Sequence, residues 1–99
     1  MGQRKYPPLE PREIEQLINA RGFAFHHAKG DHKYYIRMVS GTKTMTQIDW
    51  GVEVYDTYLI KKVISQTTLT RKQLYASTKK TAKKINVKPA SKEELENWA

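Results

Sequence analysis

Cysteine is absent from the sequence, which excludes a disulfide framework, a thiolate zinc site and catalysis by a cysteine nucleophile. Long apolar runs are absent too. No stretch approaches the roughly 18 residues of a membrane span, and residues 1–10 lack the apolar core of a signal peptide. Hydrophobic residues make up only 38% of the chain, so we expect a modest core. These absences predict a small, soluble, cytoplasmic protein without a membrane partner.

The chain has 99 residues, which is the length of one domain, and it is strongly basic. Lys and Arg number 18 against 10 Asp and Glu, which gives a net charge of +8 and a pI near 9.8. Such a charge says nothing about the fold. It favours anionic partners, namely RNA, DNA, an acidic protein or an anionic lipid surface.

The N-terminal part of the sequence predicts an extended arm followed by a helix. Residues 1–9 begin with MGQRKYPP, which is polar and contains two prolines. Proline suits the first turn of a helix at Pro11, and the acidic Glu13 and Glu15 complement the positive end of the helix dipole. An apolar stripe and the glycine after it predict a helix over Pro11–Arg21. The stripe consists of Ile14, Leu17 and Ile18.

Three short segments with the composition of strands come next, over residues 22–29, 32–39 and 42–50. Each pair is separated by a two-residue turn that contains glycine. Such short connections cannot support parallel crossovers, so we expect an antiparallel meander of three strands.

Two further helices and a short acidic turn complete the prediction. Residues 55–66 have a wide apolar face that suits packing across a sheet. A third helix is expected over residues 70–86, because its first residue, a threonine, and Gln73 form a capping box. A proline then interrupts the chain, and Ser91 with Glu94 can cap a last acidic turn.

This order predicts an α+β fold, a two-layer α-β-β-β-α sandwich with the topology of a double-stranded-RNA-binding domain. The core covers residues 10–69, and a basic helix over residues 70–88 is appended to it. Residues 89–99 form an acidic tail or a short helical turn. Topology alone does not define a function.

Most of the excess positive charge lies in residues 70–88, which contain no acidic residue. On one continuous helix, Lys72, Lys79 and Lys83 would line one side. A one-signed, localised run of this kind favours contact with phosphates of a nucleic acid, although a merely solvated helix face is the alternative. The candidate nucleic-acid-binding residues are Arg71, Lys72, Lys79, Lys80, Lys83 and Lys84.

The histidines that flank the first predicted turn are the candidates for chemistry. A zinc site there is not expected, because the adjacent His26 and His27 would point to opposite faces of a strand. We therefore expect no metal and no cofactor.

His32 follows the turn in the frame Lys29–Lys33, in which Gly30 permits the turn and Asp31 can orient the imidazole. An imidazole titrates near neutral pH, so it can take a proton from a ribose 2′-hydroxyl or return one to a leaving oxygen. Neighbouring lysines can stabilise the charge that develops on the phosphate. His32 is thus the candidate catalytic residue, supported by Lys29, Gly30, Asp31 and Lys33.

A helix that ends at Arg21–Phe23, followed by a strand and then by Lys29–Tyr35, resembles the HicA (YcfA-like) family of toxin ribonucleases. The later segments 59–66 and 69–74 are similar to the last helix of that family and its ending. The resemblance implies a dsRBD-like fold, metal-independent cleavage of mRNA by the histidine that matches His32, and inhibition by an acidic HicB-like antitoxin. The chain departs from the pattern at Asp31, where many members have serine, and after the third strand, where relatives often have another histidine.

Three hypotheses follow. The first is a HicA-like toxin of a toxin–antitoxin system, an endoribonuclease that acts on mRNA through His32. The second is a non-catalytic RNA- or DNA-binding module of the same fold that uses its basic C-terminal helix. The third is an interaction protein whose basic face receives an acidic partner. RNA left uncut over hours in a tight, salt-dependent complex would favour the second over the first.

Overall fold

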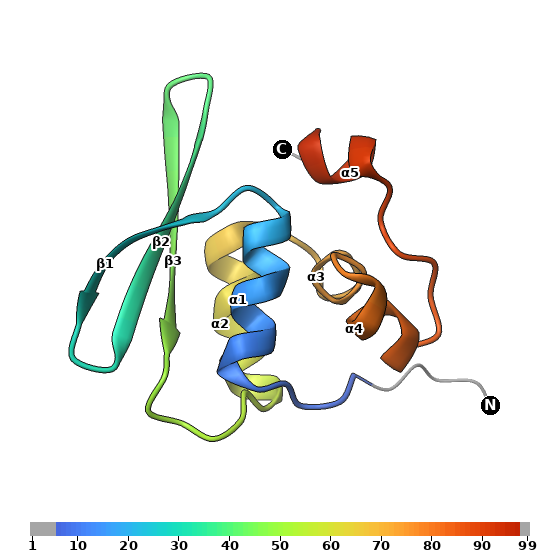
Figure 1. The fold of residues 1–99 in the computed structure, drawn as a ribbon, viewed down its shortest axis with the longest axis horizontal. Coiled ribbons are helices and arrows are strands. Elements are labelled where there is room, and N and C mark those ends of the chain that lie inside the picture. The colour runs from blue at the N-terminus through green and yellow to red at the C-terminus, as the bar shows by residue number, and fades with distance from the viewer. Residues whose placement is uncertain (1–5, 98–99) are drawn as a thin grey trace.

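The structure is a computed structural model of the chain, and it describes residues 6–97. The N-terminal half contains one helix and the three strands, and the C-terminal half contains the remaining helices (Figure 1). The elements are α1 (Pro11–Ala20), β1 (Ala24–Lys29), β2 (His32–Val39), β3 (Thr42–Asp49), α2 (Thr57–Thr67), α3 (Arg71–Tyr75), α4 (Lys79–Lys84) and α5 (Lys92–Glu96).

The three strands form an antiparallel sheet in the order β1-β2-β3, as the short turns predict. Figure 1 shows this sheet on one side of α1 and α2, and α3, α4 and α5 on the other side of these two helices. The α+β class and the α-β-β-β-α order are therefore confirmed. The C-terminal helices add a further layer behind α1 and α2.

The core lies between the sheet and α1 and α2, and it continues toward α3. The predicted stripe of α1 is fully buried, as are Tyr35 of β2 and Ile48 of β3. Helix α2 contributes Ile60 and Val63, and α3 contributes Leu74. The predicted apolar faces of α1 and α2 thus pack in one core with the sheet.

Residues 6–9 of the predicted N-terminal arm are packed against the domain. The backbone N–H of Leu9 donates to the carbonyl of Tyr55 at 3.1 Å, and the backbone N–H of Tyr55 donates to the carbonyl of Leu9 at 2.6 Å. The Leu9 side chain is buried, and the hydroxyl of Tyr75 donates to the carbonyl of Pro7 at 2.6 Å. The first five residues of the arm lie outside the described part of the chain.

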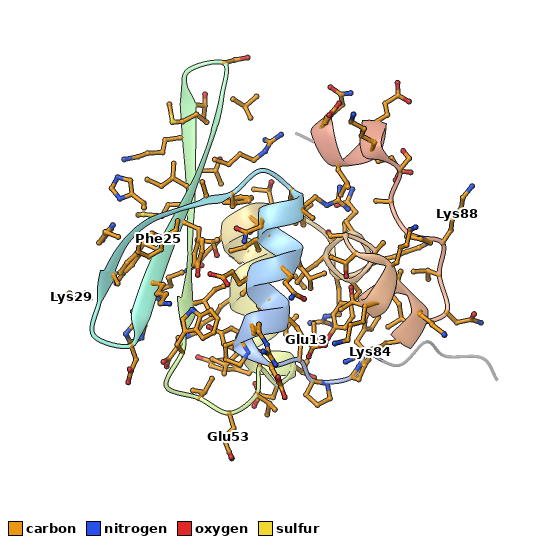
Figure 2. The ribbon with its side chains drawn as sticks, viewed as in Figure 1. Glu13, Phe25, Lys29, Glu53, Lys84 and Lys88 are labelled. Atoms are coloured by element: carbon orange, nitrogen blue, oxygen red, sulfur yellow. The ribbon has the colours of Figure 1, made fainter. Side chains whose placement is uncertain are left out.

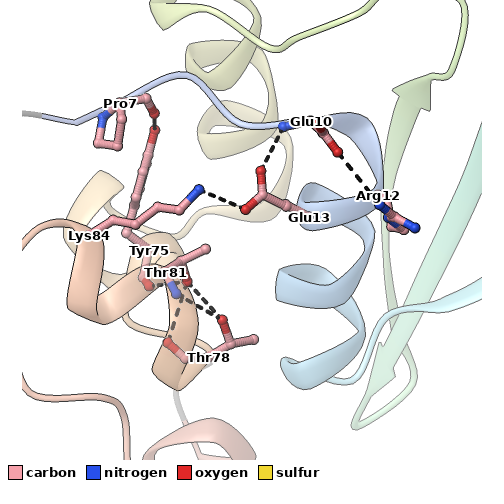
Figure 3. A network of polar contacts seen from close by, with 8 residues as sticks. All are labelled: Pro7, Glu10, Arg12, Glu13, Tyr75, Thr78, Thr81 and Lys84. Atoms are coloured by element: carbon pink, nitrogen blue, oxygen red, sulfur yellow. Dashed lines mark hydrogen bonds and ion pairs between the residues drawn. The ribbon is translucent and has the colours of Figure 1, made fainter.

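The prediction of one continuous helix over residues 70–86 is wrong, because the structure contains α3 and α4 with a break between them. The expected capping box of α3 is present. Three residues after the end of α3, the Thr78 side chain caps the N-terminus of α4. The Thr81 hydroxyl donates to the carbonyl of Tyr75 at 2.5 Å (Figure 3). Hydroxyl side chains of this kind compete with the helical hydrogen bonds for backbone groups. Helix α3 therefore ends and α4 begins, although the apolar residues keep their helical spacing across the break.

An ion pair holds α4 against α1. The ammonium group of Lys84 donates to Oε2 of Glu13 at 2.8 Å, while Oε1 accepts the backbone N–H of Glu10 (Figure 3). Glu13 is only 8% exposed. Burial alone would raise the pKa of Glu13, but these hydrogen bonds and the positive charge of Lys84 and Lys80 lower it below its ordinary value.

Replacing Glu13 by glutamine is expected to lower the free energy of unfolding by about 1–2 kcal/mol near neutral pH. Because the folded state has the lower pKa, ionised Glu13 stabilises the fold above the ordinary value of 4.5, and this contribution is lost as the pH falls through the folded-state pKa. Urea unfolding of the parent and Glu13→Gln across this range should show a difference that disappears in acid. The exposed Glu53 provides the control, because Glu53→Gln should show no such pH-dependent difference; an equal effect there would contradict the prediction.

Within residues 6–97, no helix is both long and apolar enough to cross a bilayer.

Candidate functional site

The candidate catalytic histidine lies at the start of β2, on the face of the sheet that α1 and α2 do not cover. Successive residues of a strand point to opposite faces, and Tyr35 of β2 is buried on the covered face. His32 and Tyr34 therefore lie on the other side, which we call the open face. The open face consists of the alternate residues of β2 that begin at His32 and of their cross-strand partners on β1 and β3. These residues are Ala24, His27, Lys29, His32, Tyr34, Ile36, Met38, Lys43, Met45, Gln47 and Asp49.

Asp49 is the carboxylate closest to the His32 imidazole in the site. The two residues are cross-strand partners of β2 and β3, and Nε2 of His32 lies 3.8 Å from Oδ2 of Asp49. The other carboxylate oxygen, Oδ1, accepts the backbone N–H of Gly51 at 2.8 Å. This hydrogen bond orients the Asp49 carboxylate toward the histidine. Both side chains stay partly exposed, at 47% for His32 and 32% for Asp49, so a substrate can reach them.

Asp31 lies beside the same loop, but its carboxylate lies next to Gly51, whereas the sequence predicted that it orients the imidazole of His32. A Cβ placed on Gly51 would lie 2.8 Å from Oδ2 of Asp31 and 3.2 Å from Oδ1 of Asp49. The carbonyl of Asp31 accepts the N–H of Trp50 at 2.7 Å, which joins the two turns. A larger residue at position 51 would have to displace the Asp31 carboxylate. Asp31 thus helps to shape the loop that holds Asp49, and Asp49 is the carboxylate that pairs with His32.

A small pocket of about 60 Å³ opens between the open face and α2. His32, Gln47 and Asp49 line it from the sheet, and Lys62 and Gln66 line it from α2. A histidine, an aspartate, a lysine and two glutamines therefore line one space, and the Lys62 ammonium group lies over the ring of Tyr58 on the same helix, 5.1 Å from its centroid. Such a set can transfer a proton and can neutralise charge on a phosphate.

The supporting residues of the predicted frame separate into two groups. Lys29 is the cross-strand partner of His32, on the open face, where side chains of such pairs lie about 5 Å apart at Cβ. Gly30 has a φ of 60°, the left-handed conformation that the turn requires. Lys33 lies on the opposite face, with its ammonium group 4.6 Å from the ring centroid of Trp50. The structure thus brings Lys29 to His32 and takes Lys33 away from it.

The predicted nucleic-acid-binding residues are not brought together with His32. They belong to α3 and α4, which lie beyond α1 and α2 from the sheet (Figure 1). The prediction that Lys72, Lys79 and Lys83 line one side of a single helix is wrong, because Lys72 belongs to α3 and the other two belong to α4. Lys84 pairs with Glu13, and Arg71 lies over the ring of Tyr6 at 5.7 Å. Arg71 is half-buried, and all five lysines of the set are exposed. Figure 2 places Lys84 and Lys88 on the side of the molecule opposite Lys29.

The prediction that His26 and His27 point to opposite faces is wrong. A β-bulge between Phe25 and His27 interrupts the alternation of β1, and the Nδ1 atoms of the two histidines lie 2.7 Å apart. Among residues 6–97, no group of three or more His, Asp or Glu side chains is arranged to hold a metal ion.

Comparison of the chain with models of protein families gave no match, and comparison with curated proteins gave none either.

Sequence reasoning missed the contributions of Asp49, Lys62 and Gln66. Two signals pointed to Asp49: it is one of two carboxylates near the predicted turn, and it begins the segment 49–51, where relatives of the resembled family often have a histidine. Neither signal indicates that it pairs with His32. Lys62 stands next to the similar Lys61 on the polar side of the predicted helix, so the sequence alone does not distinguish them.

Proposed function

We propose that the protein is a HicA-like, metal-independent endoribonuclease that cleaves RNA through His32. The observation that carries the proposal is the paired, half-exposed imidazole of His32 beside Asp49, Lys29 and Lys62 at the rim of an open sheet face. The sequence resemblance supports the same chemistry. It also supports mRNA as the substrate, an acidic HicB-like antitoxin as the inhibiting partner and a cytoplasmic location.

The proposed reaction needs no group beyond the RNA and these side chains. The ribose 2′-oxygen attacks the adjacent phosphorus, and His32 accepts the proton of that hydroxyl. The bond from phosphorus to the 5′-oxygen breaks, and the His32 imidazolium returns its proton to this leaving oxygen. The products are a 2′,3′-cyclic phosphate and a 5′-hydroxyl. Lys29 and Lys62 stabilise the negative charge that gathers on the phosphate, and Asp49 stabilises the imidazolium.

Digestion of a labelled single-stranded RNA in the presence of a chelator tests the proposal. We expect fragments that end in a 2′,3′-cyclic phosphate. An RNA with a single 2′-deoxy nucleotide at a cleaved position should stay intact there, because the nucleophile is missing. Cleavage that requires added metal or that proceeds at the deoxy position would contradict the mechanism.

The binding module is the second candidate, and the separation of the basic residues from His32 favours it. The lysines of α3 and α4 lie on the far side of the molecule from the open face, where they can contact backbone phosphates without taking part in cleavage. RNA that is bound in a salt-dependent manner and remains uncut over hours in the digestion would support this function and reject the nuclease.

Lys62→Gln is expected to weaken RNA binding and to reduce the slope of log affinity against log salt by about 0.7, the value for one lost phosphate contact with a single strand. Lys61 is the matched control, because it is the neighbouring exposed lysine on α2 and does not line the pocket. Binding of the two variants is measured by fluorescence anisotropy over a range of salt concentrations. Equal slopes for Lys61→Gln and Lys62→Gln would show that Lys62 has no special role.

A further inference from the structure

The open face continues beyond His32 into a second hollow that the proposed reaction does not use. Two residues along β2 from His32 is Tyr34, about 7 Å away along the strand, on the same face. Tyr34, Met45, Thr46, Gln47 and Gln66 line a hollow of about 160 Å³. Gln47 and Gln66 also line the pocket of His32, so the two spaces adjoin.

The Tyr34 ring is held flat by a neighbour on β1. The imidazole of His27 stacks on it with the ring centroids 4.4 Å apart and the planes 8° from parallel. The two residues are cross-strand partners, a position that the bulge in β1 gives to His27. A ring supported in this way loses little conformational freedom when another flat group stacks on it.

The amide of Gln66 is also fixed in orientation. Its oxygen accepts the hydroxyl of Thr46 at 2.7 Å and the backbone N–H of Gln47 at 3.1 Å. Since the oxygen is held by these two donors, the orientation of the NH₂ group at the other end of the amide is set as well. Gln66 borders both hollows, so this group can donate to an acceptor on the edge of a ligand there.

We propose that the hollow beside Tyr34 is a subsite for one unpaired nucleobase of the RNA, next to the phosphate that is cleaved at His32. The base stacks on Tyr34 and contacts Met45, which is 45% exposed. Gln66 donates a hydrogen bond to a carbonyl or ring nitrogen of the base. A base in a duplex cannot reach this hollow, so the site selects single-stranded RNA. The inference rests on the proposed function only for the position of the cleaved phosphate.

Binding measured without cleavage tests the subsite separately from the catalysis. The probe is a short fluorescein-labelled single-stranded RNA, and all proteins carry His32→Ala so that the RNA stays intact. Tyr34→Ala is expected to raise Kd about 5- to 150-fold, the range for loss of one stacked base, whereas Tyr34→Phe keeps the ring and should stay close to the parent. Phe25 is the matched control, since it is an exposed aromatic residue of the same hairpin whose ring contacts Tyr35 on the other face. Phe25→Ala should leave Kd nearly unchanged.

A second measurement needs no change in the protein beyond His32→Ala. The same RNA is made with an abasic nucleotide at each position in turn. We expect a marked loss of affinity at one position, adjacent to the linkage that the parent protein cuts, and no such loss when Tyr34 is alanine.

The results separate this inference from the proposed function. If the loss at one abasic position depends on Tyr34 and the parent protein leaves RNA uncut, the subsite stands and the nuclease does not. If abasic positions are tolerated equally, or Phe25→Ala weakens binding as much as Tyr34→Ala, the subsite is wrong whether or not RNA is cleaved.

Discussion

Replacing His32 by alanine is expected to lower the rate of RNA cleavage by about 10²–10⁴-fold, the usual contribution of a general acid–base group. His32 is the only histidine that lines the pocket, and the carboxylate of Asp49 and the ammonium group of Lys62 cannot replace an imidazole that accepts and returns a proton. The side chain is half exposed, so its removal leaves no buried cavity and should not impair folding. Cleavage is measured as initial rates under excess RNA, and folding by circular dichroism.

His26 provides the matched control for this experiment. It is an exposed histidine of the same hairpin, it does not line the pocket of His32, and it forms the bulge of β1. His26→Ala should retain most of the activity. Parent-like cleavage by a folded His32→Ala protein would remove His32 from the mechanism, and an equal loss in His26→Ala would point to the hairpin as a whole.

Arg21→Met is expected to cause the largest loss of stability, about 3 kcal/mol or more. The Arg21 side chain is buried, since only 2% of the residue is exposed. It donates to the Ser77 hydroxyl at 2.8 Å, to the carbonyl of Gln73 at 2.7 Å and to the carbonyl of Glu94 at 3.4 Å. Methionine keeps much of the apolar stem but removes these three hydrogen bonds, and of the three acceptors the Gln73 carbonyl keeps the Ser77 hydroxyl as a donor at 2.9 Å. Because this side chain joins the end of α1 to α3 and α5, both helices should loosen.

Thermal unfolding and hydrogen exchange measure the effect. A change of 1 kcal/mol shifts the Tm of a domain of this size by about 4–8 °C, so the expected shift is well above ten degrees. Arg12→Met is the control, because the Arg12 side chain is 73% exposed and its ion pair with Glu10 at 3.8 Å lies at the surface. A Tm of Arg21→Met close to that of Arg12→Met would show that the buried arginine contributes little.

The helices and strands near the N-terminus could be predicted well, whereas the region after α2 could not. Residues 32–39 form β2 as expected, and α1 ends one residue before the predicted limit. The break at Ser77 and Thr78 was missed because apolar residues keep a helical period across it. The hydroxyl groups that end α3 bind backbone atoms of the same turn and Arg21 of a distant helix. Periodicity does not detect such competition.

The candidate site was located in part from the sequence. The frame around the turn led to His32 and Lys29, which the structure places side by side. It also led to Lys33. Successive residues of a strand point to opposite faces, so Lys33 lies on the covered face when His32 lies on the open face. Asp31 was chosen as the nearest carboxylate along the chain, yet Asp49 is the one that pairs, because the register of two strands decides which residues meet.

By itself, the sequence determined the features that depend on neighbours within about one turn or one strand of the chain: the caps, the apolar stripes, the tight turns and the position of His32 after a glycine. Only the tertiary structure decided that Asp49, Lys62 and Gln66 surround His32, and that α3 and α4 lie beyond α1 and α2 from the sheet. These arrangements follow from strand register and from the packing of helices across a shared core. Strand register and helix packing both bring together residues that are far apart in the chain, and no local sequence pattern indicates which of these residues meet.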